Sequence, residues 1–183
     1  MKFKRQSIPD IIMIEPTIFF DERGYFAETF RDDLLAKVLG YKVNFIQENE
    51  SKSSRGVLRG LHYQIPPYSQ TKLVKVSEGR VLDIAVDLRK SSETFGNYVA
   101  IELSEENNYQ VFIPPGFAHG FIVLSHVATL TYKVDNYYSA EHERGVYYDD
   151  ENLAINWSLD LKDIILSEKD KSQPLLLDAS KFD

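Results

Sequence analysis

The sequence predicts an all-β protein, built as a sandwich or barrel of the jelly-roll kind. The dominant hydrophobic period is two residues, which is the period of strands rather than helices. Short candidate strands follow one another without long helices between them, and turn sequences separate them at short intervals. With 183 residues, 43% of them hydrophobic, the chain is long and apolar enough for a sizeable core. We therefore expect residues 1–183 to form a single domain.

The first clear element is a short helix over 31–39. Asp32 and Asp33 place negative charge in its first turn, where the helix dipole favours it. Gly40 follows the last apolar residue and is suited to a C-cap. We expect helices to be few and peripheral.

The strands that follow are identified by alternation. In 81–88 the even positions are all apolar, whereas Asp83 and Asp87 lie on the other face, which predicts a half-buried strand. The segment 127–136 repeats this pattern. Glu78-Gly79, between two apolar runs, predicts a hairpin loop in which glycine supplies a positive φ. Shorter strands rich in Val, Ile, Phe and Tyr are expected at 98–103, 110–113 and 121–124.

Charge and composition exclude several classes of function. There are 21 Lys and Arg against 28 Asp and Glu, a net charge of −7, which argues against nucleic-acid binding through bulk charge. The absence of cysteine excludes disulfides, thiolate metal sites and a cysteine nucleophile. No signal peptide is visible, and no apolar run approaches the roughly 20 residues of a membrane helix. We expect a cytoplasmic protein with no nucleic-acid or membrane partner.

The segment 55–75 gathers basic side chains in this acidic chain. Simple alternation puts Arg59 and His62 on opposite faces, so they could share a pocket only if the strand bulges or ends near Gly60. An edge strand with solvated cations fits periodicity equally well. His62 could equally be a hydrogen-bonded core histidine.

Two further side chains could carry chemistry. His119 lies between Ala118 and Gly120, and such small neighbours would give a substrate close access to the imidazole; the alternative is that Gly120 only permits tight packing. Tyr132 lies on the apolar side of its strand, so its hydroxyl is carried inward and needs a partner, either backbone or ligand.

We expect no metal. Metal-binding barrels of this kind often use two histidines separated by one residue, together with a carboxylate and a third histidine. Here the corresponding stretch offers only His62, and His62 with His119 falls short of a usual first-row site. No dinucleotide-binding glycine motif, P-loop or nucleophile elbow is present either.

Taken together, these segments resemble the dTDP-4-dehydrorhamnose 3,5-epimerase family. Their order and spacing match through nearly the whole chain. The resemblance implies a cupin-like jelly-roll barrel with a few short peripheral helices, a homodimer, and no metal or redox cofactor. The matching stretches are FDERGYFAETF (20–30), FIQEN (45–49), GVLRGLHYQ (56–64), QTKLVKV (70–76), GRVLDIAVD (79–87), FIPPGFAHGF (112–121), residues 132–134 and LSEKD (166–170).

The resemblance implies a chemistry that these side chains can support. The substrate would be dTDP-4-dehydro-6-deoxy-D-glucose, inverted at C3 and C5, both of which flank the C4 ketone. His62 would be the general base, supported by Asp170, and Tyr132 the general acid. Lys72 would stabilise the enolate at the C4 oxygen. Because the ketoisomerases of this group lack the acid at this position, Tyr132 favours double epimerisation.

The resemblance also implies a set of substrate contacts, which would make the site cationic within an acidic protein. In this family the N-terminal segment crosses the dimer interface, which leaves open which subunit's pocket Arg23 and Glu28 serve. A monofunctional 5-epimerase, a 3,4-ketoisomerase, a non-catalytic cupin that binds a sugar nucleotide and a metal-dependent cupin oxygenase stay as alternatives. The residues assigned to the nucleotide and diphosphate are Arg23, Glu28, Gln47, Asn49, Arg59, His119, Glu143 and Lys169.

Overall fold

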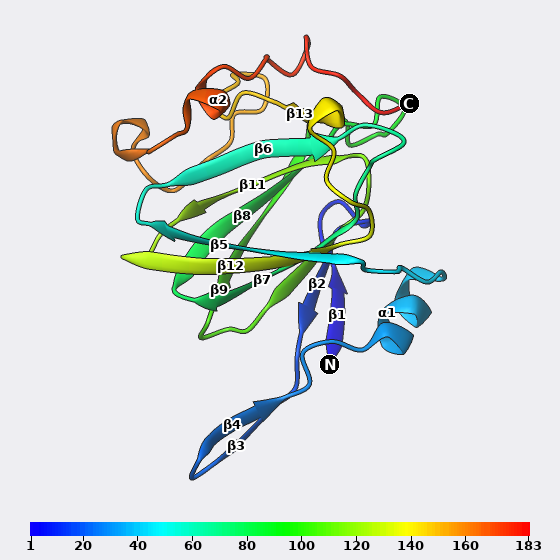
Figure 1. Ribbon diagram of the computed structural model, residues 1–183, viewed down its shortest axis with the longest axis vertical. Helices are drawn as coiled ribbons and strands as arrows, with labels where there is room; N and C mark the ends of the chain where they lie inside the picture. Colours follow the sequence, from blue (N-terminus) through cyan, green and yellow to red (C-terminus); the bar gives the residue numbers. More distant parts are fainter.

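Two antiparallel sheets face each other in the computed structural model, which describes residues 1–183 (Figure 1). From β5 to β13 the chain passes repeatedly between them, which is the arrangement of a jelly roll and confirms the predicted fold class. The six-stranded sheet has the order β1 (Lys2–Arg5), β2 (Ile12–Glu15), β10 (Gln110–Ile113), β7 (Lys72–Glu78), β12 (Val127–Val134) and β5 (Gln47–Ser54). The five-stranded sheet has the order β13 (Glu143–Gly145), β6 (Leu58–Gln64), β11 (Phe117–Val123), β8 (Arg80–Asp87) and β9 (Tyr98–Ser104).

Helices are few and lie outside the barrel, as predicted. The helix α1 spans Asp32–Leu39, and Gly40 ends it with φ +83° and a backbone bond to Ala36. A one-turn helix, α2 (Glu168–Lys171), lies against β6 at one end of the barrel. The 3-10 turns η1 (Ala140–His142) and η2 (Leu161–Asp163) complete the set. No helix has the length and apolar character needed to span a membrane.

Apolar side chains fill three layers. The central core lies between the sheets and contains 16 buried residues, such as Val74, Leu103 and Leu130. A second cluster lies under α1, on the outer face of the six-stranded sheet. A third lies between the outer face of the five-stranded sheet and the C-terminal segment, which contributes Trp157 and Leu176.

This third layer corrects one prediction. The strand expected to be half-buried at 81–88 is buried on both faces along β8, because the C-terminal segment covers the outer face. Its two aspartates, Asp83 and Asp87, are therefore buried as well, and each needs a partner.

The loop at Glu78-Gly79 is not a hairpin, contrary to the prediction. β7 pairs with β10 and β12, whereas β8 pairs with β9 and β11, so this turn carries the chain from one sheet to the other. The positive φ expected for glycine is present at Gly79, at +74°. A Cβ at this position would meet the backbone of Val127, so the close crossing also requires glycine.

A separate two-stranded hairpin, β3 (Ile18–Asp21) and β4 (Gly24–Ala27), projects away from the barrel (Figure 1). Its aromatic side chains Phe19, Phe20, Tyr25 and Phe26 are exposed, with Phe20 at 78%. An isolated two-stranded ribbon with an uncovered apolar surface gains little stability from the rest of this chain.

Candidate active site

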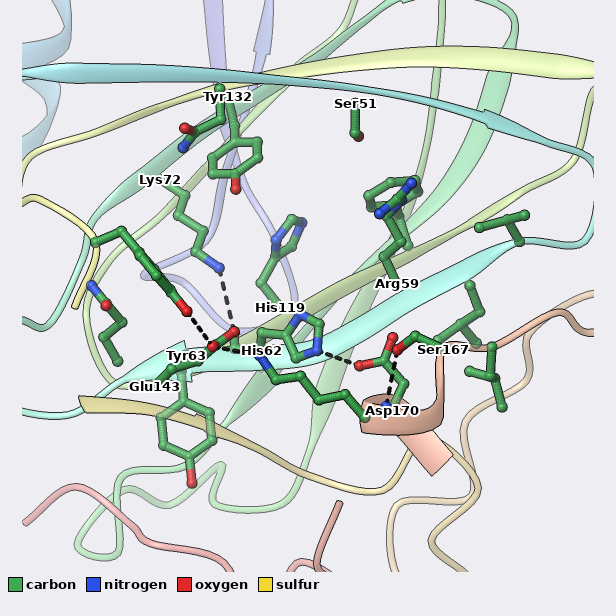
Figure 2. Close-up of a pocket in the computed structure, with 18 of the residues that line it drawn as sticks. Ser51, Arg59, His62, Tyr63, Lys72, His119, Tyr132, Glu143, Ser167 and Asp170 are labelled. Carbon is green, nitrogen blue, oxygen red and sulfur yellow. Dashed lines mark hydrogen bonds and ion pairs between the residues drawn. The ribbon is translucent and has the colours of Figure 1, made fainter. Parts of the chain in front are cut away.

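A cavity of about 560 Å³ lies between the two sheets (Figure 2). Strands of both sheets and the segment around α2 line it. Nine of the twelve side chains expected at the site line this cavity: Asn49, Arg59, His62, Lys72, His119, Tyr132, Glu143, Lys169 and Asp170.

A β-bulge in β6 brings Arg59 and His62 into the same cavity. Arg59 lies opposite Phe121 of β11, and His62 lies opposite His119, so β6 contains one residue more than its partner over this stretch. Gly60, with φ +139°, occupies the irregularity, and a Cβ there would lie 2.5 Å from the Cα of Gly120. The extra residue reverses the alternation of side chains along β6. A bulge near Gly60 is thus present, and it allows Arg59 and His62 to share a pocket.

His62 is paired with a buried carboxylate. Its Nε2 lies 2.5 Å from Asp170 Oδ1, which leaves Nδ1 as the ring nitrogen without a protein partner. Ser167 caps α2 by accepting a hydrogen bond from the Asp170 backbone N–H. Burial would raise the pKa of Asp170, but the hydrogen bond with His62, together with those from Ser167 and the Gly60 backbone, holds it below its ordinary value. The carboxylate is therefore ionised at neutral pH, and its bond to Nε2 orients the His62 ring.

A second histidine–carboxylate pair lies deeper in the cavity. His119 Nε2 is 2.8 Å from Asp83 Oδ2, and both side chains are buried. Burial lowers the pKa of His119, and the nearby Lys72 ammonium lowers it further, although Asp83 acts in the opposite direction. His119 is therefore neutral near pH 7, so the positive charge of the cavity comes from its Lys and Arg side chains.

Lys72 supplies a buried cation from β7. Burial lowers its pKa to about 8, partly offset by Asp83 and Glu143. Its Nζ donates a hydrogen bond to the backbone oxygen of His62 at 3.3 Å, so the ammonium lies beside the proposed base. At neutral pH most of Lys72 is charged, and a desolvated ammonium is well suited to stabilise an oxyanion.

Tyr132 points its hydroxyl into the cavity from β12, on the wall opposite β6 (Figure 2). Burial raises its pKa, although the Asn49 side chain, which is its cross-strand neighbour, lowers it in part. The hydroxyl therefore stays protonated near neutral pH and can act as a proton donor.

Glu143 and Lys169 form an ion pair at the cavity, and Tyr138 donates a hydrogen bond to Glu143 Oε2 at 2.7 Å. Burial would raise the pKa of Glu143, but its contacts with Lys169 and Tyr138 hold it below its ordinary value. The cluster joins β13, α2 and the loop before η1.

Three expected residues do not line the cavity. Gln47 lies next to it and donates its amide to Asn49 Oδ1 at 2.8 Å. Arg23 is at the tip of the projecting hairpin, where it pairs with Asp21, and Glu28 follows the hairpin and pairs with Arg31.

Sequence reasoning missed several side chains of the site. Ser167 could have been found, because Ser-x-x-Asp before a short helix is a capping pattern. Asp83 carried a weaker signal: an acid on the same face as Val81 and Ala85 requires a buried partner. Ser51 on β5 also lines the cavity, and its sequence context gave no signal of this.

Comparisons with known proteins identify the family of this chain. The family described as dTDP-4-dehydrorhamnose 3,5-epimerase matches residues 5–178. The dTDP-4-dehydrorhamnose 3,5-epimerase of Shigella flexneri is 48% identical over 182 residues, covering 100% of this chain and 99% of its own length.

Solved structures match the chain over nearly its whole length. That of the Elizabethkingia anophelis dTDP-4-dehydrorhamnose 3,5-epimerase matches with a TM-score of 0.94 and 49% identity, over 97% of each chain. The dTDP-6-deoxy-D-glucose-3,5-epimerase of Legionella pneumophila, solved in complex with dTDP-4-keto-L-rhamnose, matches with a TM-score of 0.92 and 46% identity, over 96% of this chain and 93% of its own.

Proposed function

This chain belongs to the dTDP-4-dehydrorhamnose 3,5-epimerase family, and on this premise we propose how its cavity inverts C3 and C5 of dTDP-4-dehydro-6-deoxy-D-glucose to give dTDP-4-dehydro-L-rhamnose. His62 acts as the base, Tyr132 as the acid and Lys72 as the enolate stabiliser. The observation that carries these roles is the placement of His62 and Tyr132 on opposite sheets, facing one cavity.

Opposite placement is what an inversion requires. His62 Nδ1 removes the proton from C3 or C5 on one face of the sugar ring, and the electron pair of the C–H bond moves toward the C4 oxygen. The resulting enolate is stabilised by the Lys72 ammonium. Tyr132 then delivers a proton to the same carbon from the other face, and solvent restores both groups. Because the base and the acid approach from different walls, the carbon returns with the opposite configuration.

The charge states support each role. Asp170 stabilises His62 after it has accepted a proton, and its own pKa is low enough to keep it ionised. The raised pKa of Tyr132 keeps its proton available, and the pKa of Lys72, about 8, keeps most of that side chain charged at pH 7. Substrate and product are isomers, so the reaction needs no oxidant or reductant. We expect activity to survive dialysis against a chelator.

Solvent exchange tests the reaction directly. With substrate in deuterated water, deuterium should enter both C3 and C5, as read by NMR, and His62→Asn should abolish both signals. Deuterium at one carbon alone would indicate a mono-epimerase. Tight binding of the nucleotide sugar with no exchange would indicate a non-catalytic binding protein.

We also propose that the protein is a homodimer in which the β3–β4 hairpin completes the partner's site. Support comes from the hairpin itself, whose four aromatic side chains are exposed and which lies apart from the barrel. Arg23 at its tip is remote from the cavity of its own chain, although the family resemblance assigns it to the substrate.

A mixed dimer distinguishes the two possible arrangements. Arg23→Ala and His62→Asn are each expected to be inactive or impaired alone. If the hairpin serves the partner, a dimer of one Arg23→Ala chain and one His62→Asn chain contains one intact site and regains activity. If the hairpin serves its own chain, no intact site forms and mixing restores nothing. Sedimentation of the wild type gives the oligomeric state, and a monomer would overturn the proposal.

A further inference from the structure

A buried glutamine joins two loops beside the cavity. Gln64 lies at the end of β6, two residues after His62 and therefore on the same side of the strand, and it is only 4% exposed. Its Nε2 donates hydrogen bonds to the backbone oxygens of Tyr68, at 2.9 Å, and Tyr137, at 3.3 Å. Its Oε1 accepts one from the Ser139 backbone N–H at 2.6 Å. Both donor hydrogens of the amide are thus used within the protein.

These bonds fix the residue that lies between two of the partners. Tyr137 and Ser139 flank Tyr138, so the Gln64 amide holds the chain immediately before and after that side chain. Tyr138 lines the cavity and donates a hydrogen bond to Glu143 Oε2 at 2.7 Å. Glu143 is itself the cross-strand neighbour of Gln64 in the pairing of β13 with β6. Gln64 therefore supports Tyr138 through the backbone, while Glu143 holds its hydroxyl.

Tyr138 lies toward the open end of the cavity. It is 54% exposed, whereas Lys72 and His119 are 9% and 6% exposed. Because the sugar ring must reach the buried groups, the nucleotide part of the ligand extends toward the exposed end, past Tyr138. A loop side chain loses conformational freedom when it binds a ligand, and a loop that is already ordered reduces this cost.

We propose that Gln64 is a positioning residue, whose amide holds Tyr138 in place to contact the nucleotide part of the substrate. This inference rests on the proposed function, because it takes the ligand to be a nucleotide sugar. None of the groups assigned to proton transfer belongs to the loop that carries Tyr138. Loss of the Gln64 hydrogen bonds therefore weakens binding of substrate and transition state alike, which raises KM and leaves kcat nearly unchanged.

The test compares Gln64→Met with Asn107→Leu. Methionine has nearly the length of glutamine but neither its donors nor its carbonyl acceptor. Asn107, in the loop between β9 and β10, also makes three hydrogen bonds to backbone groups through its amide, with Glu102, Ser104 and Tyr109. It does not line the cavity. The matched variant therefore measures what the loss of such bonds does to stability alone, as read by urea unfolding.

Gln64→Met should weaken dTDP binding, measured by calorimetry, about 5- to 10-fold, the effect of losing one neutral hydrogen bond, and should raise KM similarly. Asn107→Leu should match the wild type in dTDP affinity, KM and kcat, even where unfolding shows the two variants to be equally destabilised. Unchanged dTDP affinity in Gln64→Met, or a fall in kcat alone, would overturn the proposal. If the methionine variant does not fold, Gln64→Asn, whose amide is one methylene shorter, is expected to give the same result.

A double-mutant cycle with Tyr138→Ala distinguishes positioning from direct contact. If Gln64 acts through Tyr138, Gln64→Met should cost little further dTDP affinity once the tyrosine ring is absent. An equal loss in both backgrounds would contradict the proposal, because Gln64 would then contact the ligand itself or act through the fold in general.

Deuterium exchange by the wild type keeps this proposal apart from the proposed function. No exchange, with intact dTDP binding that Gln64→Met weakens, would overturn the function but not the role of Gln64. Normal exchange with unaltered dTDP affinity in Gln64→Met would overturn the role of Gln64 but not the function.

Discussion

The cavity holds two histidine–aspartate pairs with similar geometry and different surroundings. In the first, His62 is 28% exposed and Asp170 is 4% exposed; in the second, His119 and Asp83 are 7% and 2% exposed. The first pair joins β6 to the short helix α2, whereas the second lies within the five-stranded sheet, between neighbouring strands β11 and β8.

Access to solvent separates their chemistry. Desolvation lowers the pKa of His119, and Lys72 lowers it further, so its imidazole stays neutral near pH 7. When a neutral His119 directs its Nε2 proton to the Asp83 carboxylate, its Nδ1 is an acceptor. His62 is less deeply buried, so its ring is accessible to solvent. The same pairing thus suits a base in one position and a rigid hydrogen-bond acceptor in the other.

The largest expected difference in kinetics is between variants in which one or the other histidine is replaced. His62→Asn is expected to lower kcat by about 10²–10⁴-fold and to abolish solvent exchange at both carbons, since the general base is lost. His119→Asn should mainly raise KM and retain exchange at saturating substrate. Mass spectrometry of product formed in deuterated water measures both. Loss of exchange in His119→Asn alone would reverse the assigned roles.

Removing the acid sharpens the same comparison from the opposite wall. Tyr132→Phe should leave deprotonation by His62 in place, so deuterium exchange continues, while inversion falls by about 10²–10⁴-fold. Parallel assays of exchange and of product configuration separate these steps. Inversion at the wild-type rate in this variant would show that another group delivers the proton.

Lys72 is next to both pairs and its titration should limit activity at high pH. The pKa of Lys72 is about 8, whereas that of Tyr132 is raised above its ordinary value, so the cation is lost first as pH increases. We expect kcat/KM to fall above about pH 8. Lys72→Arg should move this fall in kcat/KM to higher pH if the guanidinium fits. Lys72→Gln should cost about 2.7–4 kcal/mol of barrier at pH 7. If an active Lys72→Arg variant lost kcat/KM at the same pH as the wild type, another group would be responsible for the decrease.

The smallest effect concerns stability. The pKa of His119 is lowered in the folded state, so below its ordinary value of about 6.5 the unfolded chain binds a proton that the folded chain does not. This contribution lowers the free energy of unfolding as pH decreases through that window, by up to about 1.4 kcal/mol per pH unit, and vanishes above it. Urea unfolding between pH 8 and 5 measures the slope. His119→Gln should reduce it, and an unchanged slope would show that His119 is not the group responsible.

Much of the fold follows from local sequence patterns. Alternation of apolar residues marks β8 and β12, and the acids and glycine around 31–40 mark α1, because both signals depend on neighbours within one element. The resemblance of ordered motifs to a known family identified His62, Lys72 and Tyr132, which the structure brings to one cavity.

Other features needed the tertiary structure. Strand alternation alone could not tell that Glu78-Gly79 joins two sheets, because strand pairing is decided by partners distant in sequence. The same holds for the bulge at Gly60, which turns Arg59 and His62 to one side, since it depends on the close approach of Gly120.

The sequence by itself determined an all-β chain with a specific set of candidate acids, bases and cations. It could do so because residue type and hydrophobic period are local properties of the sequence. Only the tertiary structure decided how each group behaves. Burial distinguishes His119 from His62 and brings the pKa of Lys72 to about 8. It also leaves Ser51 without a partner. The physical reason is that desolvation and hydrogen-bond satisfaction depend on all the atoms that surround a group, most of which come from remote parts of the chain.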